Sequence, residues 1–265
     1  MLDVQNIELT FNPGTINEKK ALSGLSLHLN SGDFCTVIGS NGAGKSTMLN
    51  AVAGVFMVDS GKISINGNDI TKLPEFKRAA YIGRVFQDPM LGTAADMEIE
   101  ENLALAKRRG LKRSLKIGIT KKEREEYYNL LKKLNLGLED RLKTKAGLLS
   151  GGQRQALTLI MATLKKPELL LLDEHTAALD PATASTILKL TDEVIQENNL
   201  TALMVTHNMQ DAIDHGNRLI MMNDGEIILD VKGEDKKNLT KEILIHKFAE
   251  LSGDQIENDA LLLAH

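Results

Sequence analysis

The chain has 265 residues and a net charge of −4, with 42% hydrophobic and 26% charged residues, as is typical of a soluble globular protein. This charge argues against general binding of nucleic acid, although a local basic patch remains compatible with it. The length suffices for one large domain, or for a domain with a subdomain. No apolar run approaches the roughly 18 residues of a membrane span, and residues 1–5 do not have the pattern of a signal peptide. The single cysteine, Cys35, is expected to be a small buried hydrophobe in a reducing, cytosolic protein.

Three strands are predicted before residue 39. Residues 2–11 alternate between apolar and polar, Leu22–Leu29 repeats leucine at alternate positions, and 34–38 is short, apolar and β-branched like a buried strand. Phe11 ends the first of these strands near the start of a possible nucleotide domain. Its aromatic ring would suit stacking on adenine, but its spacing fits a core phenylalanine equally well.

A glycine-rich segment follows the third strand and fits the G-x-x-x-x-G-K-[ST] phosphate-loop pattern in full. A predicted helix over 47–53 comes next, with Gly54 placed to end it. In such a loop the backbone N–H groups and the helix N-terminus bind phosphate, Lys45 reaches the β- and γ-phosphates, and the Ser46 hydroxyl ligates Mg²⁺. The loop is Gly39-Ser40-Asn41-Gly42-Ala43-Gly44-Lys45-Ser46-Thr47.

Two further strands are predicted before the sequence pattern becomes helical. Residues 61–67 end in Asn-Gly, a strong hairpin signal. Residues 81–86 are predicted to form a short strand, with Gln87 directly after its end. The amide oxygen of Gln87 could complete the ligand shell of a magnesium ion. For a glutamine considered alone, a position on the surface is the simpler interpretation.

Residues 97–148 have a helical pattern, including a helix predicted over 123–136. A basic cluster within this segment, from Lys107 to Arg124, suggests either an anionic neighbour such as a lipid headgroup surface or simply a solvated face.

The next segments place polar groups at the ends of helices and strands. Ser150, Gly151, Gly152 and Gln153 open a helix, and two glycines at a helix start make a second end suited to anions. The apolar run 169–172 predicts a strand buried on both faces, followed by Asp173 and Glu174 where open α/β sheets bind ligands. In such a place Asp173 suits Mg²⁺ and Glu174 a water molecule.

Three more features follow along the chain. Asp180 and Pro181 are placed as N-cap and first residue of a helix, and the buried strand 200–206 leads to His207, level with the two carboxylates. A hairpin is predicted over 218–229, around Asp224-Gly225. The remaining residues are charged, with a helix near 243–251 and a tail over 258–265.

This set of motifs resembles that of ABC-type ATPases, the nucleotide-binding subunits of ATP-binding cassette systems, over residues 2–230. The motifs stand in the family's order: the phosphate loop 39–47, a glutamine loop at Gln87, a signature segment 149–153, the strand ending at Asp173-Glu174, the loop 178–180 and a switch histidine, His207. Phe11 matches the family's adenine-stacking aromatic residue. The resemblance implies an α/β P-loop core with an N-terminal antiparallel β subdomain and an inserted helical subdomain.

The resemblance also implies a domain division. Residues 1–230 would form one ABC ATPase domain, in which 1–87 and 149–230 make the ATP-binding core and 88–148 the helical subdomain. Residues 231–265 would form a C-terminal helical tail.

One position departs from the family pattern. Proline commonly follows the catalytic glutamate, whereas this chain has His175. We expect histidine to relax the restraint that proline places on φ and to add a titratable group beside Glu174. The variant around His175, with the basic segment after residue 106, is similar to ATPases of importers for aromatic or branched-chain amino acids.

The mechanism implied by the resemblance needs two copies paired head to tail, with ATP between the phosphate loop of one copy and Ser150, Gly151 and Gly152 of the other. Glu174 would act as general base, and His207 would hold the γ-phosphate and water in line. Lys45 would offset the developing charge together with Mg²⁺, which Ser46, Gln87 and Asp173 would hold.

Two functions are consistent with this resemblance. The first is the ATPase subunit of a transporter that imports an amino-acid-like solute, peripheral on the cytoplasmic face of the membrane. Its partners would be a separate permease and a separate substrate-binding protein, with no nucleic acid. The second is a soluble ABC ATPase of an assembly system, such as iron–sulfur cluster assembly.

Overall fold

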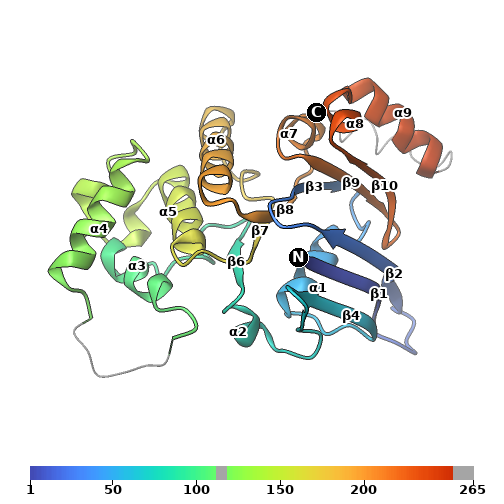
Figure 1. Cartoon of the computed structure of the whole chain (residues 1–265), viewed down its shortest axis with the longest axis horizontal. Coiled ribbons are helices and arrows are strands. Elements are labelled where there is room, and N and C mark those ends of the chain that lie inside the picture. Colours follow the sequence, from blue (N-terminus) through green and yellow to red (C-terminus); the bar gives the residue numbers. More distant parts are fainter. Residues whose placement is uncertain (112–117, 253–265) are drawn as a thin grey trace.

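The computed structural model describes residues 1–111 and 118–252, whose strands form two sheets (Figure 1). The smaller sheet is antiparallel, in the order β2-β1-β4-β5, and the larger has the order β10-β9-β3-β8-β7-β6. Together with an inserted set of helices, this arrangement confirms the predicted fold class. The strands of the smaller sheet are β1 (Leu2–Phe11), β2 (Lys19–Leu29), β4 (Ser60–Ile65) and β5 (Asn68–Asp69).

The antiparallel sheet shows how a local irregularity corrects the apolar pattern of β1. Leu2 and Val4 are buried, and so are Ile7 and Leu9, so the buried positions change from even to odd along the strand. The change coincides with Asn6, which has a φ of 50° and lies where the pairing with both neighbouring strands shifts. A bulge of this kind keeps both halves of the strand facing the core.

The larger sheet is parallel except at one edge. Its strands are β3 (Phe34–Gly39), β6 (Ile82–Val85), β7 (Leu169–Asp173), β8 (Thr201–Val205), β9 (Arg218–Asn223) and β10 (Glu226–Lys232), and β10 alone pairs antiparallel. In β7, Leu169 and Leu171 pack on one face, against α1 (Lys45–Ala53) and the smaller sheet, while Leu170 and Leu172 pack on the other. Burial on both faces explains why the strand is a continuous apolar run.

The segment between β6 and β7 forms a lobe of helices at the left of Figure 1. Its elements are α3 (Ile99–Lys107), α4 (Lys121–Lys132), the short 3₁₀ turns Glu139–Arg141 and Ala146–Leu148, and α5 (Gly151–Thr163). The helix predicted over 123–136 is therefore displaced. A reciprocal capping box between Thr120 and Glu123 starts it earlier, and the left-handed residues Asn135 and Gly137 lie beyond its end.

Four described members of the basic cluster have partners inside the lobe, whereas Lys121 and Lys122 are exposed. Lys107 lies 2.6 Å from Glu126, Arg108 lies 3.0 Å from Glu123, Arg124 forms a two-pronged contact with Glu100, and Arg109 donates to backbone carbonyls of Ala162 and Lys165. Lys112 and Arg113 lie outside the described residues. Four of the described cations therefore have a structural role within the lobe, and the two interpretations of the cluster, an anionic neighbour or a solvated face, stay predictions.

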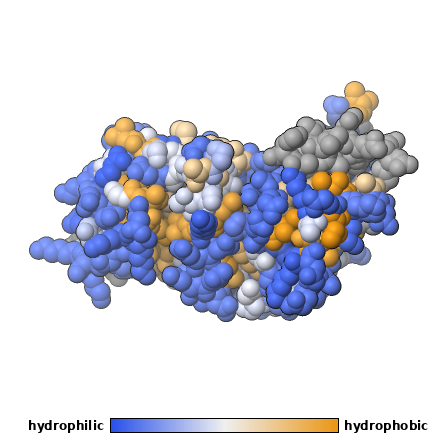
Figure 2. All heavy atoms as spheres, turned by 90° about the horizontal axis from the view of Figure 1, so that it is seen from above, coloured by the Kyte–Doolittle hydropathy of each residue, from blue (hydrophilic) through white to orange (hydrophobic). Residues whose placement is uncertain are grey.

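The remaining helices are α2 (Glu75–Arg78), α6 (Pro181–Asn198), α7 (Met209–Asp214), α8 (Glu234–Lys237) and α9 (Lys241–Ser252). Leu244 and Phe248 of α9 are fully buried in a cluster with residues of α7 and β9. The predicted tail over 258–265 lies outside the described residues. No helix in the described ranges is long and apolar enough to cross a bilayer, and the surface visible in Figure 2 is mostly hydrophilic.

Arg78 is a buried cation that joins two elements near the phosphate loop. Its side chain is 1% exposed and donates to the carbonyl oxygens of Ala51, Val52, Thr71 and Leu73 at 2.7–2.9 Å. Two of these carbonyls belong to the last turn of α1, where the helix itself leaves carbonyl oxygens without their usual donors. Arg78 thus fixes the end of α1 to the segment that precedes β6.

We predict that Arg78→Met lowers the free energy of unfolding by about 3 kcal/mol, because it leaves buried carbonyl oxygens without donors. Urea denaturation followed by circular dichroism measures the change. Lys77→Met is the matched control, since Lys77 is exposed on the same helix and its loss is expected to change stability by less than about 0.5 kcal/mol. Equal effects of the two substitutions would contradict the role of Arg78.

Candidate functional site

Four adjacent parallel strands deliver the predicted site residues to one edge of the larger sheet. The phosphate loop follows β3, His207 follows β8, Asp173 ends β7, and Gln87 comes two residues after β6. Oε2 of Glu174 lies 3.6 Å from Nδ1 of His207 and 3.3 Å from Nε2 of Gln87. The structure thus brings together Glu174, His207 and Gln87.

The phosphate loop encloses a cavity of about 350 Å³ at the N-terminus of α1. It is lined by residues 41–47 of the loop and also by Phe11, Lys19, Ala21 and Glu174. Gly44 precedes α1 with a φ of 97°, and a Cβ atom there would lie 2.7 Å from the carbonyl oxygen of Ala21. Only glycine therefore permits this loop conformation, which leaves the backbone N–H groups at a helix N-terminus free to bind an anion.

Lys45 is 6% exposed and donates to the carbonyl oxygens of Gly39 and Ser40, at 2.6 and 2.9 Å. Burial lowers the pKa of Lys45, and the charge of Glu174 opposes this change. The ammonium group is therefore held by neutral carbonyls alone, an arrangement that an anion in the cavity would complete.

Phe11 and Lys19 also line the cavity, one as a candidate contact for adenine and the other as a cation near the phosphate loop. Phe11 is half-buried and meets Phe56 edge-on, with ring centroids 5.2 Å apart, so both sequence interpretations remain open and adenine stacking stays a prediction. Lys19 adds a second cation near the loop: its Nζ lies 3.4 Å from where a Cβ of Gly42 would be. Lys19 was not predicted as a site residue. The sequence signal that could have indicated it is the Lys19-Lys20 pair at the start of a strand, soon after Phe11.

Glu174 has the electrostatic properties of a charged acceptor. Its contact with His207 holds the pKa of Glu174 below its usual value, with Lys45 acting in the same direction and burial opposing them. The same contact raises the pKa of His207. Glu174 also has a φ of 43°, a left-handed conformation that is uncommon for a non-glycine residue and typical of functional sites.

Asp173 is 17% exposed, and Arg84 is its ion-pair partner, with Nη2 of Arg84 3.4 Å from Oδ2 of Asp173. Burial raises the pKa of Asp173 more than Arg84 lowers it, so the carboxylate is incompletely compensated. Among the described residues no three acids, histidines or cysteines cluster as metal ligands. A hydroxyl, an amide and one carboxylate, from Ser46, Gln87 and Asp173, fit Mg²⁺, which completes its shell with water and phosphate oxygens.

The signature residues lie apart from this cavity. Ser150 caps α5 in a reciprocal box with Gln153, and a Cβ on Gly152 would lie 2.3 Å from Cγ2 of Thr183. Glycine therefore allows the starts of α5 and α6 to approach each other. Asp180 caps α6 by accepting from the backbone N–H of Thr183. None of Ser150, Gly151, Gly152, Gln153 and Asp180 lines the phosphate-loop cavity.

His175 does not have the properties that its sequence position suggested. It is 2% exposed, and its Nε2 lies 3.0 Å from Oγ1 of Thr191. The Thr191 hydroxyl donates its one proton to the carbonyl of Ile187, so it accepts from Nε2–H of His175. Burial lowers the pKa of His175 to about 4. The titratable group expected beside Glu174 is therefore present but buried and neutral near pH 7, and it anchors the loop to α6; the relaxed restraint on φ stays a prediction.

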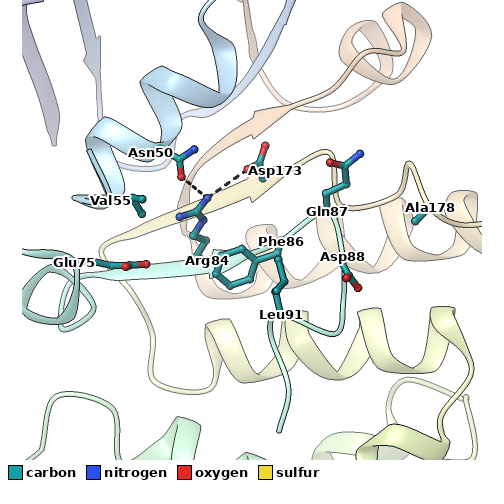
Figure 3. A pocket seen from close by; sticks show the side chains of 10 residues that line it. All are labelled: Asn50, Val55, Glu75, Arg84, Phe86, Gln87, Asp88, Leu91, Asp173 and Ala178. Carbon is teal, nitrogen blue, oxygen red and sulfur yellow. Dashed lines mark hydrogen bonds and ion pairs between the residues drawn. The ribbon is translucent and has the colours of Figure 1, made fainter. Parts of the chain in front are cut away.

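A groove of about 640 Å³ lies beside the carboxylate of Asp173 (Figure 3). Arg84 and Asn50 lie within it and are joined by a hydrogen bond of 2.7 Å. Neither was predicted as a site residue, although an arginine inside a short apolar strand was a visible signal. The lining residues are Asn50, Val55, Glu75, Arg84, Phe86, Gln87, Asp88, Leu91, Asp173 and Ala178.

Comparison with known proteins identifies a family. Residues 22–177 match the family model described as ABC transporter. The chain is 45% identical, over 94% of its length and 98% of the relative's, to "Tyrosine transport ATP-binding protein" of Clostridioides difficile. It is 38% identical to "Methionine import ATP-binding protein MetN" of Rhizobium etli, over 78% of this chain and 56% of that protein.

Solved structures lead to the same family. A dimeric ATP-binding cassette in a post-hydrolysis state, bound to ADP and Pi, matches with a TM-score of 0.74 and 28% identity, covering 88% of this chain and 98% of that one. A cassette in its ADP conformation matches with a TM-score of 0.76, over 95% and 98% of the two chains. The chain therefore belongs to the ABC transporter ATP-binding proteins, which hydrolyse ATP.

Proposed function

We propose that this chain is the ATP-hydrolysing subunit of a transporter that imports an amino-acid-like solute through a separate permease. The observation that carries the proposal is the junction of the phosphate-loop cavity with Glu174 and His207. The narrower solute class is supported by the relative named for tyrosine transport, whose similarity extends over nearly the whole of both chains. Relatives named for phosphonate import and for energy-coupling factor transport, at 31% and 32% identity, show that the cassette alone does not fix the solute.

In the proposed reaction, Lys45 and the N-terminus of α1 bind the β- and γ-phosphates of ATP. Glu174 accepts a proton from the attacking water, and His207 orients Glu174 and contacts the γ-phosphate. Mg²⁺, held by Ser46, Gln87 and Asp173, would supply charge neutralisation on the phosphate oxygens. Phe11 would contact the adenine ring from the wall of the same cavity.

The proposed unit of hydrolysis is a head-to-tail pair of chains. Ser150 and Gly151 are exposed at the start of α5 and do not line the cavity of their own chain. They are therefore available to contact the γ-phosphate of ATP bound to a second copy, with Gln153 and Asp180 supporting the same face. The dimeric cassette among the solved structures, bound to ADP and Pi, supports this arrangement.

The groove beside Asp173 is the surface that we propose for the permease. Val55, Met90 and Leu91 are exposed apolar side chains at or beside it, and Phe76 is exposed on the neighbouring helix α2. Water-exposed apolar groups that gather around one groove favour a partner. The chain would then lie on the cytoplasmic face of a membrane, and an importer would also use a separate substrate-binding protein.

We predict that Lys45→Ala abolishes hydrolysis and weakens ATP binding about tenfold or more, because charge-assisted bonds to the phosphates are lost. Isothermal titration calorimetry measures the affinity and a phosphate-release assay the turnover. Lys20→Ala, which removes an exposed lysine paired with Glu8, is the control and should leave both unchanged. Normal affinity and turnover in Lys45→Ala would exclude the assigned role.

We predict that Glu174→Gln binds ATP, lowers kcat at least about a hundredfold and accumulates as a dimer, because the amide keeps the shape of the side chain but cannot accept a proton. Light scattering with ATP and magnesium should show a doubled mass. Glu197→Gln, on the exposed side of α6, should remain active. If the Glu174→Gln variant stays monomeric with ATP, the result would argue against the head-to-tail pair. If it hydrolyses ATP at the normal rate, the result would argue against Glu174 as the general base.

We predict that single cysteines at Met90 and Leu91 cross-link to a membrane subunit in native membranes. The background is favourable, because Cys35 is buried and burial raises its pKa to about 12. A cysteine at Ile243, exposed on α9 outside the groove, is the control. Cross-links from Ile243 without cross-links from Met90 or Leu91 would show that the permease docks on another surface. Cross-links to no membrane protein would favour a soluble assembly ATPase.

A further inference from the structure

Arg84 lies between the carboxylate of Asp173 and the groove. One nitrogen of its guanidinium, Nη2, is 2.7 Å from Oδ1 of Asn50 and 3.4 Å from Oδ2 of Asp173 (Figure 3). The guanidinium carbon lies 4.6 Å from the centre of the Phe86 ring. Arg84 therefore contacts three elements: α1, the end of β7, and the residue directly before Gln87.

The ion pair between Arg84 and Asp173 is largely shielded from water, but its hydrogen bond is long. The side chains of Arg84 and Asp173 are only 14% and 17% exposed, so water screens their attraction little. Within the described ranges, Arg84 is the one cation paired with Asp173. At 3.4 Å the hydrogen bond is nevertheless long, and the buried Nε of Arg84 has no partner. The guanidinium thus has unused donor capacity.

This position places Arg84 in competition with a metal ion. A cation bound to Asp173 would meet a second positive charge in a largely buried site, and like charges at such distances oppose each other. Arg84 also lines the groove, together with the exposed side chains of Val55 and Leu91. A partner that fills the groove would therefore contact the guanidinium directly.

We propose that Arg84 is a positioning residue that links the groove to the metal site. While the groove is empty, the guanidinium pairs with Asp173 and weakens the binding of Mg²⁺; an occupant of the groove whose oxygen atoms accept from the unused donors of the guanidinium draws it away and strengthens that binding. The proposal rests on the proposed docking of a permease in the groove. It assigns to this chain a restraint on ATP turnover in the absence of a partner.

The first test measures metal affinity without turnover. The chain is saturated with ADP, and Mg²⁺ is titrated calorimetrically, with Mn²⁺ binding followed by electron paramagnetic resonance as a second readout. Arg84→Gln, which keeps a polar side chain but removes the charge, should bind either metal about tenfold more tightly, a change typical of coupling between sites. Arg84→Lys, which keeps the charge, should resemble the unmodified chain.

Lys77→Gln is the matched control, because it removes an exposed positive charge from α2 that does not pair with Asp173. Its metal affinity should not change. Thermal unfolding without ligand checks that each variant is folded. Unchanged or weaker metal binding in folded Arg84→Gln would overturn the proposal, since Arg84 would then only pack or orient Asp173.

The second test fills the groove chemically. Leu91→Cys is alkylated with a bulky aromatic maleimide, which should tighten Mg²⁺ binding towards the Arg84→Gln value. In the double variant with Arg84→Gln, the same alkylation should have no further effect. Alkylation that changes Mg²⁺ affinity equally with Arg84 and with Arg84→Gln would exclude the link through Arg84. Alkylation that leaves Mg²⁺ affinity unchanged when Arg84 is present would exclude it as well. ADP binding itself is measured in every sample, so a failure to bind nucleotide would refute the proposed function rather than this inference.

Discussion

The parallel pairing of β3, β8, β7 and β6 is the constraint on which the rest of the structure depends. Parallel strands end at the same edge of a sheet, so groups from positions 39–47, 87, 173–174 and 207 meet although they are far apart in sequence. The pairing requires both faces of the sheet to be covered. On one face lie α1 and the antiparallel sheet, and on the other lie α6 and the helical lobe. The fold thus builds the site and supports it with the same strands.

The charges at this edge are arranged as incomplete pairs. Lys45 is held by carbonyl oxygens, Glu174 by an exposed histidine, and Asp173 by an arginine at the limit of hydrogen-bond distance. Desolvation makes such partial compensation costly, and a bound phosphate with the proposed metal would supply the missing charges. Binding of nucleotide therefore completes the electrostatics of the site. His175 shows the contrasting solution, since it lies beside Glu174 but is neutral and fully engaged with α6.

The contacts around Arg84 connect this edge to the surface. Asn50, Phe86 and Asp173 converge on one guanidinium, and Phe86 is followed directly by Gln87 at the entrance to the helical lobe. The site, the groove and the start of the lobe therefore share side chains. A change in the charge state of the site has a short physical route to the surface where a partner would dock, without any need for a long pathway.

The sequence by itself determined the elements and the chemistry that depends on local order. The phosphate loop, the apolar strand before Asp173-Glu174, the capped helix at Asp180 and the Asp224-Gly225 hairpin follow from short-range patterns, and the structure has each of them. The tertiary structure decided what depends on neighbours distant in the chain. Lys19 and Arg84 became site residues through packing against the loop and β7, and the buried partner Thr191 made His175 an anchor instead of a charge. The reason is physical: a side chain's conformation is encoded locally, but its burial and its partners, which set its pKa and its role, are fixed only when the sheets and helices close around it.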